Sequence, residues 1–290
     1  GATFNGFEAN IRVDALTGGG AIESGFFGSG SITFGVDNGS GTFTGTLDDN
    51  GASAGNYIKE GTGTQTLSGA NTYTGTTTVN GGTLSLASGS SHSGTGAYTV
   101  NSGILEIATG VDLSGHAMTI NSGGVISPGN SPGTAATGSQ TWNDGGTYLW
   151  EINDSGGTKG GNPGWDWLDI TGTLDLTSLT TGGFTIDIDS LTSLDLAGTA
   201  DGFDTYTKGD GNADYTFTIA SFDTLQGDYF DASLFTLDTS GFSNAPGWDW
   251  SIALSGNDLV LEAYAVPEPS SAALLGLGGL ALALRRKRNQ

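Results

Sequence analysis

The sequence predicts an all-β fold, a parallel β-solenoid in which short strands stack coil upon coil. One strand-and-turn unit recurs at a nearly constant spacing of about 20 residues, and the repeating stretch contains no helical segment. The composition agrees, because 52 of the 290 residues are glycine and Thr, Ser, Asn and Asp are abundant. Such a profile is typical of many short strands joined by turns.

The recurring unit is the segment 79–86, VNGGTLSL. Similar segments follow at 100–107 (VNSGILEI) and 120–127 (INSGGVIS), at offsets of 21 and 20 residues. A coil of this length cannot bury its inward face alone, so each coil must stack on the next.

The stretch 64–86 shows how one coil is built. Its threonines and valine favour extended backbone, since branching at Cβ suits a pleated surface. Corners are expected at 69–71 and 80–82, where Gly and Asn accept the backbone angles of tight turns. The stretch carries no charge, so we interpret it as scaffold.

Residues 1–62 predict further coils with looser spacing, and 63–140 form the regular repeat. Segments 31–34 and 41–47 alternate apolar and small residues, as half-buried strands do. The chain begins inside strand-like sequence, which we interpret as a mature end or as a fragment that lacks upstream coils.

Two stretches carry a family resemblance. The run YIKEGTGTQTLSGANTYTGTTTVNGGTLSL (57–86), preceded by GTFTGTLDDNG, resembles the autotransporter-associated β-strand repeat. ISPGNSPGT (126–134) resembles a turn that occurs further along such proteins. The resemblance covers about 40–175 and implies a right-handed parallel β-helix on an exported surface protein. No outer-membrane barrel sequence follows, so we do not expect a self-translocating autotransporter.

Residues 141–265 form an acidic, tryptophan-bearing β region. Twenty acids lie between Asp144 and Glu262, whereas 61–143 contains only Glu106 and Asp112. Alternating segments such as 147–152 and 184–188 continue the strands, with acids on one wet face. We expect the last coils and a β-rich cap here, since an open solenoid end would recruit other strands.

Residues 266–290 form a tail of different character. An uncharged run of 13 residues, 272–284, is followed by a basic cluster. The run predicts a short hydrophobic helix, below the roughly 20 residues that span hydrocarbon. The basic cluster should stay cytoplasmic, which places the preceding chain outside.

This tail resembles the PEP-CTERM sorting signal of Gram-negative bacteria. The residues that match are Pro267, Glu268, Pro269, Arg285, Arg286, Lys287 and Arg288. The resemblance implies recognition and cleavage near the proline–glutamate–proline triplet by an exosortase-type enzyme. The tail would hold the protein transiently in the inner membrane before processing, as a membrane anchor that is then removed.

Charge and cysteine content limit the partners. The formal net charge is −22, and only four basic residues precede the tail cluster. Such a body repels phosphate backbones, so we expect no nucleic acid partner. The absence of cysteine excludes disulfides and thiolate metal sites.

The tryptophans suggest a binding alternative. The sequence PGWDW occurs twice, with Trp165 and Trp167 in one copy and Trp248 and Trp250 in the other. Residues two apart share one strand face. An exposed pair would stack on sugar rings of a surface or matrix polysaccharide, whereas a buried pair would plug the solenoid end. We favour burial.

Two further groups of residues are candidate sites, an acidic segment and two histidines. Asp210, Asn212 and Asp214 have the spacing of calcium ligands, but the glycine and glutamate of a calcium-binding helix–loop–helix are absent. An acidic turn is the favoured interpretation, with a weak Ca²⁺ site as the alternative and no other cofactor. His92 and His116 lie in Ser- and Gly-rich contexts, where we expect exposed bystanders.

The sequence therefore predicts an exported structural or adhesion protein of the cell surface or extracellular matrix, without catalysis. A carbohydrate-binding surface protein that uses the tryptophans is the first alternative. A β-helix enzyme that degrades polysaccharide is the second. With 30 acids, the sequence alone selects no catalytic carboxylate pair.

Overall fold

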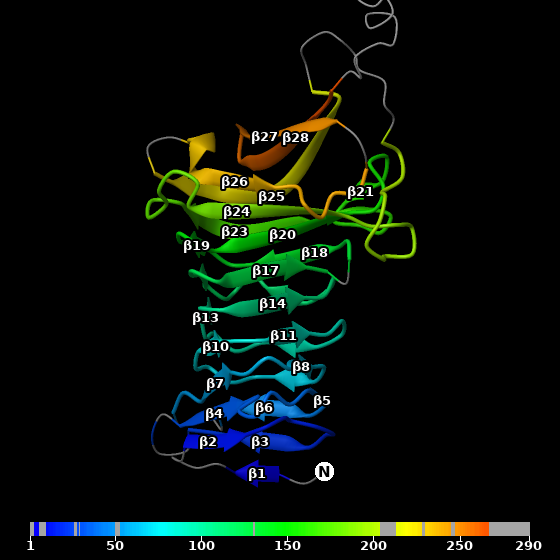
Figure 1. Ribbon diagram of the computed structural model, residues 1–290. Helices are drawn as coiled ribbons and strands as arrows, with labels where there is room; N and C mark the ends of the chain where they lie inside the picture. Colours follow the sequence, from blue (N-terminus) through cyan, green and yellow to red (C-terminus); the bar gives the residue numbers. More distant parts are fainter. Residues whose placement is uncertain are drawn as a thin grey trace, which may run out of the picture.

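The chain folds as stacked β-strands, and the computed structural model describes residues 3–5, 10–25, 28, 30–49, 53–129, 131–203, 213–227, 230–244 and 247–266. Within these residues the helical content is one short 3₁₀ helix, η1 (Ala232–Leu234). Strands climb from β1 at the N-terminal end to β27 and β28 at the other (Figure 1). The all-β prediction is confirmed, and the parallel sheets are consistent with a β-solenoid.

The first large sheet runs the length of the molecule. Its strands, in hydrogen-bonding order, are β2 (Asn10–Val13), β4 (Ser31–Phe34), β7 (Asn56–Lys59), β10 (Thr77–Val79), β13 (Tyr98–Val100), β16 (Met118–Ile120), β19 (Gln140–Trp142), β23 (Trp167–Asp175), β25 (Tyr215–Gln226), β28 (Asp258–Ala265) and β27 (Trp248–Ser255). Two short strands join it at the side, β15 (Asp112–Leu113) and β18 (Thr134–Thr137).

The second large sheet stacks beside the first. Its strands are β5 (Gly41–Phe43), β8 (Thr64–Leu67), β11 (Thr83–Leu86), β14 (Gly103–Ile107), β17 (Gly124–Pro128), β20 (Thr147–Ile152), β22 (Gly164–Trp165), β21 (Thr158–Lys159), β24 (Phe184–Ser190) and β26 (Phe235–Asp238). Smaller sheets contain β1 (Thr3–Asn5), β3 (Ala21–Glu23) and β6 (Thr46–Asp48), and β9 (Ala70–Asn71) with β12 (Ser91–His92).

The predicted repeat positions stand directly above one another. Val79 pairs in parallel with Val100, which pairs with Ile120, and Leu84 pairs with Leu105. These side chains are at most 1% exposed, so the spacing of 21 and 20 residues brings the same inward position back in each coil. The strand boundaries expected around 80–82 also hold. At 69–71, however, the expected corner contains a short strand of its own, β9.

A lysine lies inside the coil that opens the repeat. Lys59 is 0% exposed, and its Nζ donates to the backbone oxygens of Glu60, Gly61 and Gly81 at 2.6, 3.2 and 3.1 Å. Burial lowers the pKa of this lysine. A Cβ on Gly82, whose φ is +59°, would lie 2.8 Å from this Nζ, so the glycine makes room for it. Lysine here ties two coils together through main-chain acceptors.

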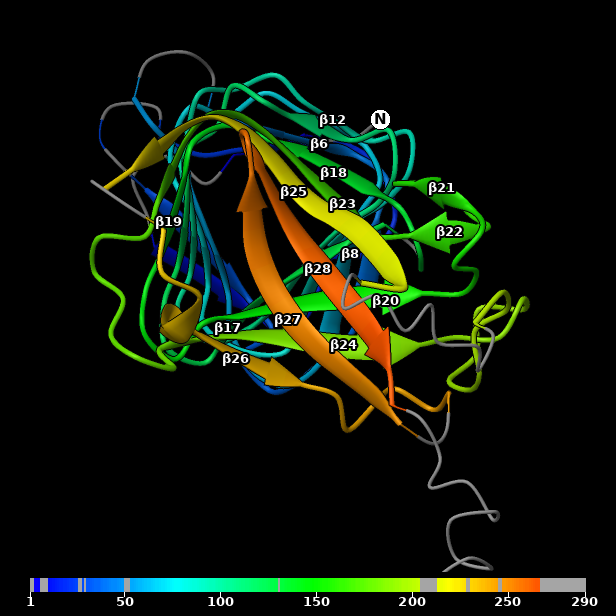
Figure 2. The ribbon, with the colours of Figure 1, turned by 90° about the horizontal axis from the view of Figure 1, so that it is seen from above.

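The C-terminal end of the stack differs in strand direction. β25 pairs antiparallel with β28, and β28 pairs antiparallel with β27. Seen from above, β25, β28 and β27 lie across the end of the coils (Figure 2). The strands thereby cover the last inward faces. The predicted hydrophobic tail helix lies outside the described residues. Within those residues, no helix has the length and apolar character needed to cross a membrane.

Candidate functional site

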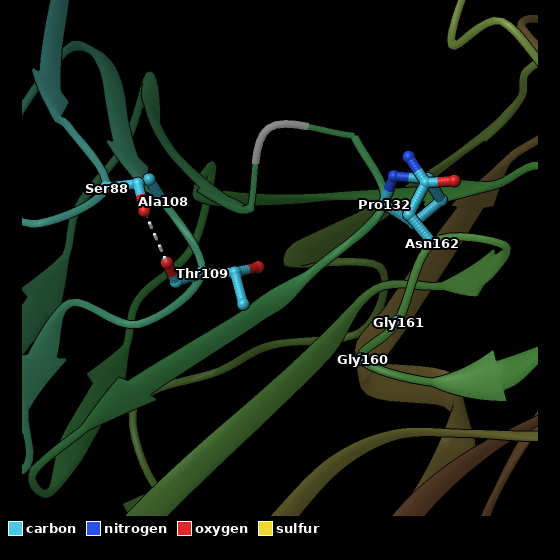
Figure 3. Close-up of a pocket in the computed structure, with 7 residues that line it drawn as sticks. All are labelled: Ser88, Ala108, Thr109, Pro132, Gly160, Gly161 and Asn162. Atoms are coloured by element: carbon cyan, nitrogen blue, oxygen red, sulfur yellow. Dashed lines mark hydrogen bonds between the residues drawn. The ribbon is translucent and has the colours of Figure 1, made fainter.

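A side pocket of about 330 Å³ lies where the regular coils meet the acidic region (Figure 3). Coil turns supply one wall, and the β21–β22 segment supplies the other. The lining residues are Ser88, Ala108, Thr109, Pro132, Gly160, Gly161 and Asn162. Ser88 Oγ donates to the Thr109 backbone oxygen at 3.3 Å. The described side chains that line the pocket are short and uncharged, so the pocket suits a small neutral group better than an ion.

A buried carboxylate anchors the turn behind this pocket. Asp166 is 0% exposed and accepts from the backbone N–H of Gly133 at 2.7 Å and of Glu151 at 3.0 Å. Its own backbone oxygen accepts from the Trp150 indole at 2.9 Å. Burial raises the pKa of Asp166 well above its usual range, and the Glu151 carboxylate acts in the same direction. Asp166 therefore joins the turn at 131–134 to β20.

A chain of amide contacts extends this anchor toward the surface. Asn153 Nδ2 donates to Asn162 Oδ1 at 2.8 Å and to Asp195 Oδ1 at 2.9 Å. Asn162 Nδ2 in turn donates to the Ser131 backbone oxygen at 3.1 Å and to Asp195 Oδ2 at 2.7 Å. Ser131 Oγ donates to Glu151. Among the described residues that line the pocket, Asn162 supplies the one side-chain amide, and this amide is already engaged.

Carboxylates also line up on the outer face of the second large sheet. Asp187 on β24 pairs with Asp238 on β26, and Glu151 on β20 pairs with Asp189 on β24. Burial raises the pKa of Asp187 to about 6, with Asp189 and Asp238 adding repulsion. Burial and the charge of Asp238 likewise raise the pKa of Asp189. Burial and repulsion therefore stabilise the protonated forms of Asp187 and Asp189, whereas the hydrogen bond from the Ser240 backbone N–H lowers the pKa of Asp238.

This arrangement limits what the carboxyl groups can do chemically. Asp166 and Glu151 are the two most buried acids of the network, and the oxygens of Asp166 already accept two backbone N–H groups. A carboxyl that is 0% exposed cannot contact a soluble substrate. In the part of the chain that the structure describes, no three His, Cys, Asp or Glu side chains gather as a metal site.

Three of the four proposed sugar-stacking tryptophans meet at the cap. Ring centroids lie 5.1 Å apart for Trp165–Phe217, 6.1 Å for Phe217–Trp250 and 5.2 Å for Phe203–Trp248. All three indoles are half-buried and pack against the core. The fully buried Trp150 lies 6.1 Å from Trp250. The cluster fills the end of the stack, in line with the favoured interpretation.

Trp167 lies apart from this cluster. Its Nε1 donates to Ser221 Oγ at 3.0 Å, and Lys159 Nζ stands 3.9 Å from the centre of its ring. The exposed lysine thus covers one face of this ring in a cation–π contact. Sugar stacking by Trp165, Trp167, Trp248 or Trp250 stays a prediction.

The other proposed site residues fall largely outside the described residues. Asp210 and Asn212 lie there, as does the whole sorting tail from Pro267 onward. Asp214 is described, and its Oδ2 accepts from the backbone N–H of Ala265 at 2.8 Å. This contact holds the end of β28 against the start of β25. The calcium site stays a prediction.

The expectation of exposed histidines is wrong. His92 and His116 are 7% and 4% exposed. His92 Nδ1 shares a hydrogen bond of 3.0 Å with the Tyr98 hydroxyl, and His116 Nε2 lies 2.9 Å from the His92 backbone oxygen. Burial lowers the pKa of His92 to about 4. Their Ser- and Gly-rich surroundings suggested loops, but these residues stack inside neighbouring coils.

The alternation of inward and outward side chains, extended just beyond the strands, could have indicated the buried polar groups. Asp166 lies two residues before the inward residue Leu168 of β23, and His116 lies two residues before the inward residue Met118 of β16. Side chains two apart point to the same face of a strand. A polar residue at an inward parity therefore indicates a structural hydrogen-bonding role.

Comparisons with known proteins agree with the sequence resemblances. Residues 58–86 match the family model of the passenger-associated-transport-repeat, and residues 265–288 match that of the PEP-CTERM protein-sorting motif. A segment of 95 residues is 39% identical to the adhesin BmaC autotransporter of Brucella suis biovar 1 (strain 1330). That segment is 31% of this chain and only 3% of the adhesin.

These matches confirm what the two stretches resemble. The motifs indicate an exported cell-surface protein of a Gram-negative-type bacterium, and the tail implies processing by an exosortase-type system. None of the described residues that line the pocket lies within either match, and Ser88 follows the end of the repeat match by two residues. The chain thus carries a passenger-associated-transport repeat, as autotransporter-type surface proteins do, together with a PEP-CTERM sorting motif.

Proposed function

We propose that this chain is a structural and adhesion protein of the cell surface or extracellular matrix, working without catalysis. The observation that carries the proposal is the union, in one chain, of a passenger-type repeat and a PEP-CTERM motif. An adhesin shares similarity with part of the chain, which supports adhesion as the role. Buried, hydrogen-bonded carboxyls at the one conspicuous acid network support a scaffold rather than an enzyme.

The scaffold in this proposal is a right-handed parallel β-helix. The pairing of Thr77, Thr78 and Val79 with both β7 and β13 in parallel registers supports it. Four parts make up the proposed chain: coils at 1–62, regular repeat at 63–140, an acidic region with a cap at 141–265, and the tail at 266–290. A stack of this kind gives an extended surface, because every coil contacts only its neighbours.

Sorting in this proposal proceeds through the tail. The apolar run 272–284 lies in the inner membrane for a time, with Arg285, Arg286, Lys287 and Arg288 on the cytoplasmic side. An exosortase-type enzyme then cleaves near Pro267, Glu268 and Pro269. The repulsion between this acidic body and anionic headgroups favours release from the membrane surface after cleavage.

The test is expression of the full chain in a bacterium that holds an exosortase-type system. The processed protein should lack the mass of the tail and should react with antibody on intact cells. Replacing Pro267, Glu268 and Pro269 with alanine should leave the tail attached and abolish the antibody signal on intact cells. Replacing Ser270 and Ser271 with alanine is the matched control and should change neither readout. A wild-type chain that stays inside cells with an intact tail contradicts the proposal.

A further inference from the structure

The pocket between the regular coils and the acidic region has two unlike walls. The first wall carries two short hydroxyl side chains, since Ser88 follows β11 and Thr109 follows β14, the strand paired with β11. The second wall contains the Pro132 ring and the backbone of Gly160 and Gly161. The Thr109 side chain extends from the first wall toward the second (Figure 3). The pocket thus has a hydroxyl side and a side rich in C–H groups.

The hydroxyl wall has unused hydrogen-bonding capacity. Thr109 Oγ1 accepts from the Thr134 backbone N–H at 3.1 Å, and its own O–H has no acceptor among the described residues. Ser88 Oγ donates to the Thr109 backbone oxygen at 3.3 Å and accepts no hydrogen bond from those residues. A hydroxyl has one donor and two acceptor lone pairs. The two exposed side chains therefore offer an outside group one donor and at least one acceptor.

The second wall offers C–H groups and few donors. The backbone N–H groups of Gly160 and Gly161 already donate within their own segment, at 2.7 and 3.1 Å. Pro132 has no N–H, and both amide N–H groups of Asn162 are engaged. A ligand would contact this wall mainly through its apolar surface.

The two walls are tied together before any ligand arrives. The Thr134 backbone N–H bonds to Thr109 Oγ1, and Thr134 Oγ1 donates to the Gly160 backbone oxygen at 3.0 Å. A Cβ on Gly160, whose φ is +67°, would lie 2.1 Å from Thr134 Oγ1, so the glycine permits this close approach. The pocket is thus pre-formed, and a ligand has little ordering entropy to overcome.

The unused groups select a class of ligand. An anion only accepts hydrogen bonds and would find one free donor, because the adjacent Lys159 already stacks on Trp167. A metal cation would find no carboxylate among the described lining residues. A neutral pyranose ring has hydroxyls that both donate and accept along its edge, and C–H groups on its faces. The volume of about 330 Å³ is near the lower end for small-molecule pockets, which suits a single ring.

We propose that this pocket binds one neutral pyranose unit of a surface or matrix polysaccharide. The sugar hydroxyls bond to Ser88 and Thr109, and a C–H face of the ring packs on Pro132. None of the described lining residues is a tryptophan, so this site differs from the tryptophan alternative. The inference rests on the proposed adhesion function and gives it a ligand class. A single sugar should bind weakly, with a Kd of about 1 mM or higher, and many copies on a surface would add avidity.

The test is an NMR titration of the full chain, held in a detergent that has no sugar headgroup. The probes are the neutral methyl pyranosides of glucose, galactose and mannose. At least one of them should shift the backbone amide signals of Ser88, Thr109 and Gly161. Glucuronate, the anionic relative of glucose, should bind at least about tenfold more weakly, because the acidic body repels its carboxylate.

Two pairs of variants locate the site. Ser88→Phe places a ring at the pocket and should abolish the shifts, whereas Ser102→Phe makes the same change at an exposed corner outside the pocket. Thr109→Val removes the free O–H and should weaken binding about fivefold, as expected for one hydrogen bond. Thr109→Ser keeps the hydroxyl and should bind as the wild type does. Circular dichroism and urea midpoints establish that each variant folds.

The outcomes separate this inference from the proposed function. Absence of shifts with all of the neutral probes, or shifts confined to the tryptophan cluster, would overturn it. Equal losses in Ser88→Phe and Ser102→Phe, unchanged binding by Thr109→Val, or tighter binding of glucuronate would overturn it as well. Surface delivery is measured separately, by tail cleavage and antibody on intact cells, and would stand in each of these cases.

Discussion

The regular coils and the capped end of the molecule bury their inward side chains in different ways. Between β7 and β17 the strands of the two large sheets run parallel. The interior there holds aliphatic side chains such as Leu84 and Leu105 and a smaller set of rings that includes Tyr57, Tyr98 and His116. At the cap, β25, β28 and β27 run antiparallel, and the interior is a cluster of rings around Phe217 and Trp250. Within 61–143 only two residues are charged, whereas acids crowd the capped end.

The difference shows what a repeat requires and what its end requires. Each coil only needs to match the next coil, so side chains that recur in register, such as Val79, Val100 and Ile120, fill most of the interior. The last coil has no successor, and large rings fill the space that one would fill. The antiparallel strands lie across the opening, and β27 becomes the edge strand of the first large sheet. The coils are thus held by positions that recur from coil to coil, whereas the cap is held by contacts that occur once.

The largest effect should come from emptying the cap interior. Trp150→Ala removes a ring that is 0% exposed and donates to the Asp166 backbone oxygen. We expect a loss of about 3–5 kcal/mol of unfolding free energy, measured by urea denaturation. Leu196→Ala, at a side chain that is 64% exposed, is the control and should stay within about 0.5 kcal/mol. Equal losses of unfolding free energy for Trp150→Ala and Leu196→Ala would contradict the role of Trp150 in packing the cap interior.

A smaller effect is expected at the junction between the two regions. Asp166→Ala leaves the backbone N–H groups of Gly133 and Glu151 without their acceptor. Each orphaned donor costs about 1–3 kcal/mol, and relief of the buried carboxyl offsets part of that. We expect a net loss of about 2 kcal/mol by urea denaturation. Asp166→Asn keeps one acceptor oxygen and should lose less; a larger loss for asparagine than for alanine argues against the anchor role.

In the coils, side-chain hydrogen bonds link Asn80, Asn101, Asn121 and Asn143 from one coil to the next, and this asparagine ladder should contribute less stability than the cap. Asn101→Ala removes the bond to Asn80 and the bond from Asn121. Because both amides are accessible to water, the loss should be about 1 kcal/mol, at the lower end for two hydrogen bonds. Thermal unfolding measures it. A loss as large as that of Trp150→Ala would show that the ladder, and not the stacked interior, holds the coils together.

The smallest effect concerns the carboxylates of the capped end. The pKa of Asp187 is raised to about 6, so the folded chain binds this proton more tightly than the unfolded chain does. Stability from this group is therefore complete below about pH 4 and is lost as pH rises to about 6. Asp187→Asn should raise the midpoint temperature at pH 7 and leave it unchanged at pH 4. A benefit that is the same at both pH values contradicts the repulsion.

The sequence predicted the coils far better than the cap. The spacing of 21 and 20 residues aligned Val79, Val100 and Ile120 as they pair in the structure, because a repeat carries its own register. No sequence repeat indicates that Glu151 pairs with Asp189, because the segments of the capped end do not repeat. The carboxylate pairs could not be predicted for that reason.

The burial of polar residues was the other feature that the sequence did not predict. His116 and Asp166 contact main-chain atoms far along the chain, at Gly96 and Gly133. Backbone donors and acceptors carry no sequence signal, so only strand parity pointed inward. The tryptophans were easier, because large rings in a region that needs a cap favour burial.

In this structure the half-buried tryptophans pack against the core and close the end of the stack. The most direct test is urea denaturation of wild type, Trp165→Ala and Trp248→Ala, with a polysaccharide pull-down on the same samples. We expect lower urea midpoints for both variants, because each change removes a ring that packs against the core. Specific, saturable polysaccharide binding that is lost on replacing Trp165 or Trp248, with the urea midpoint unchanged, would contradict it.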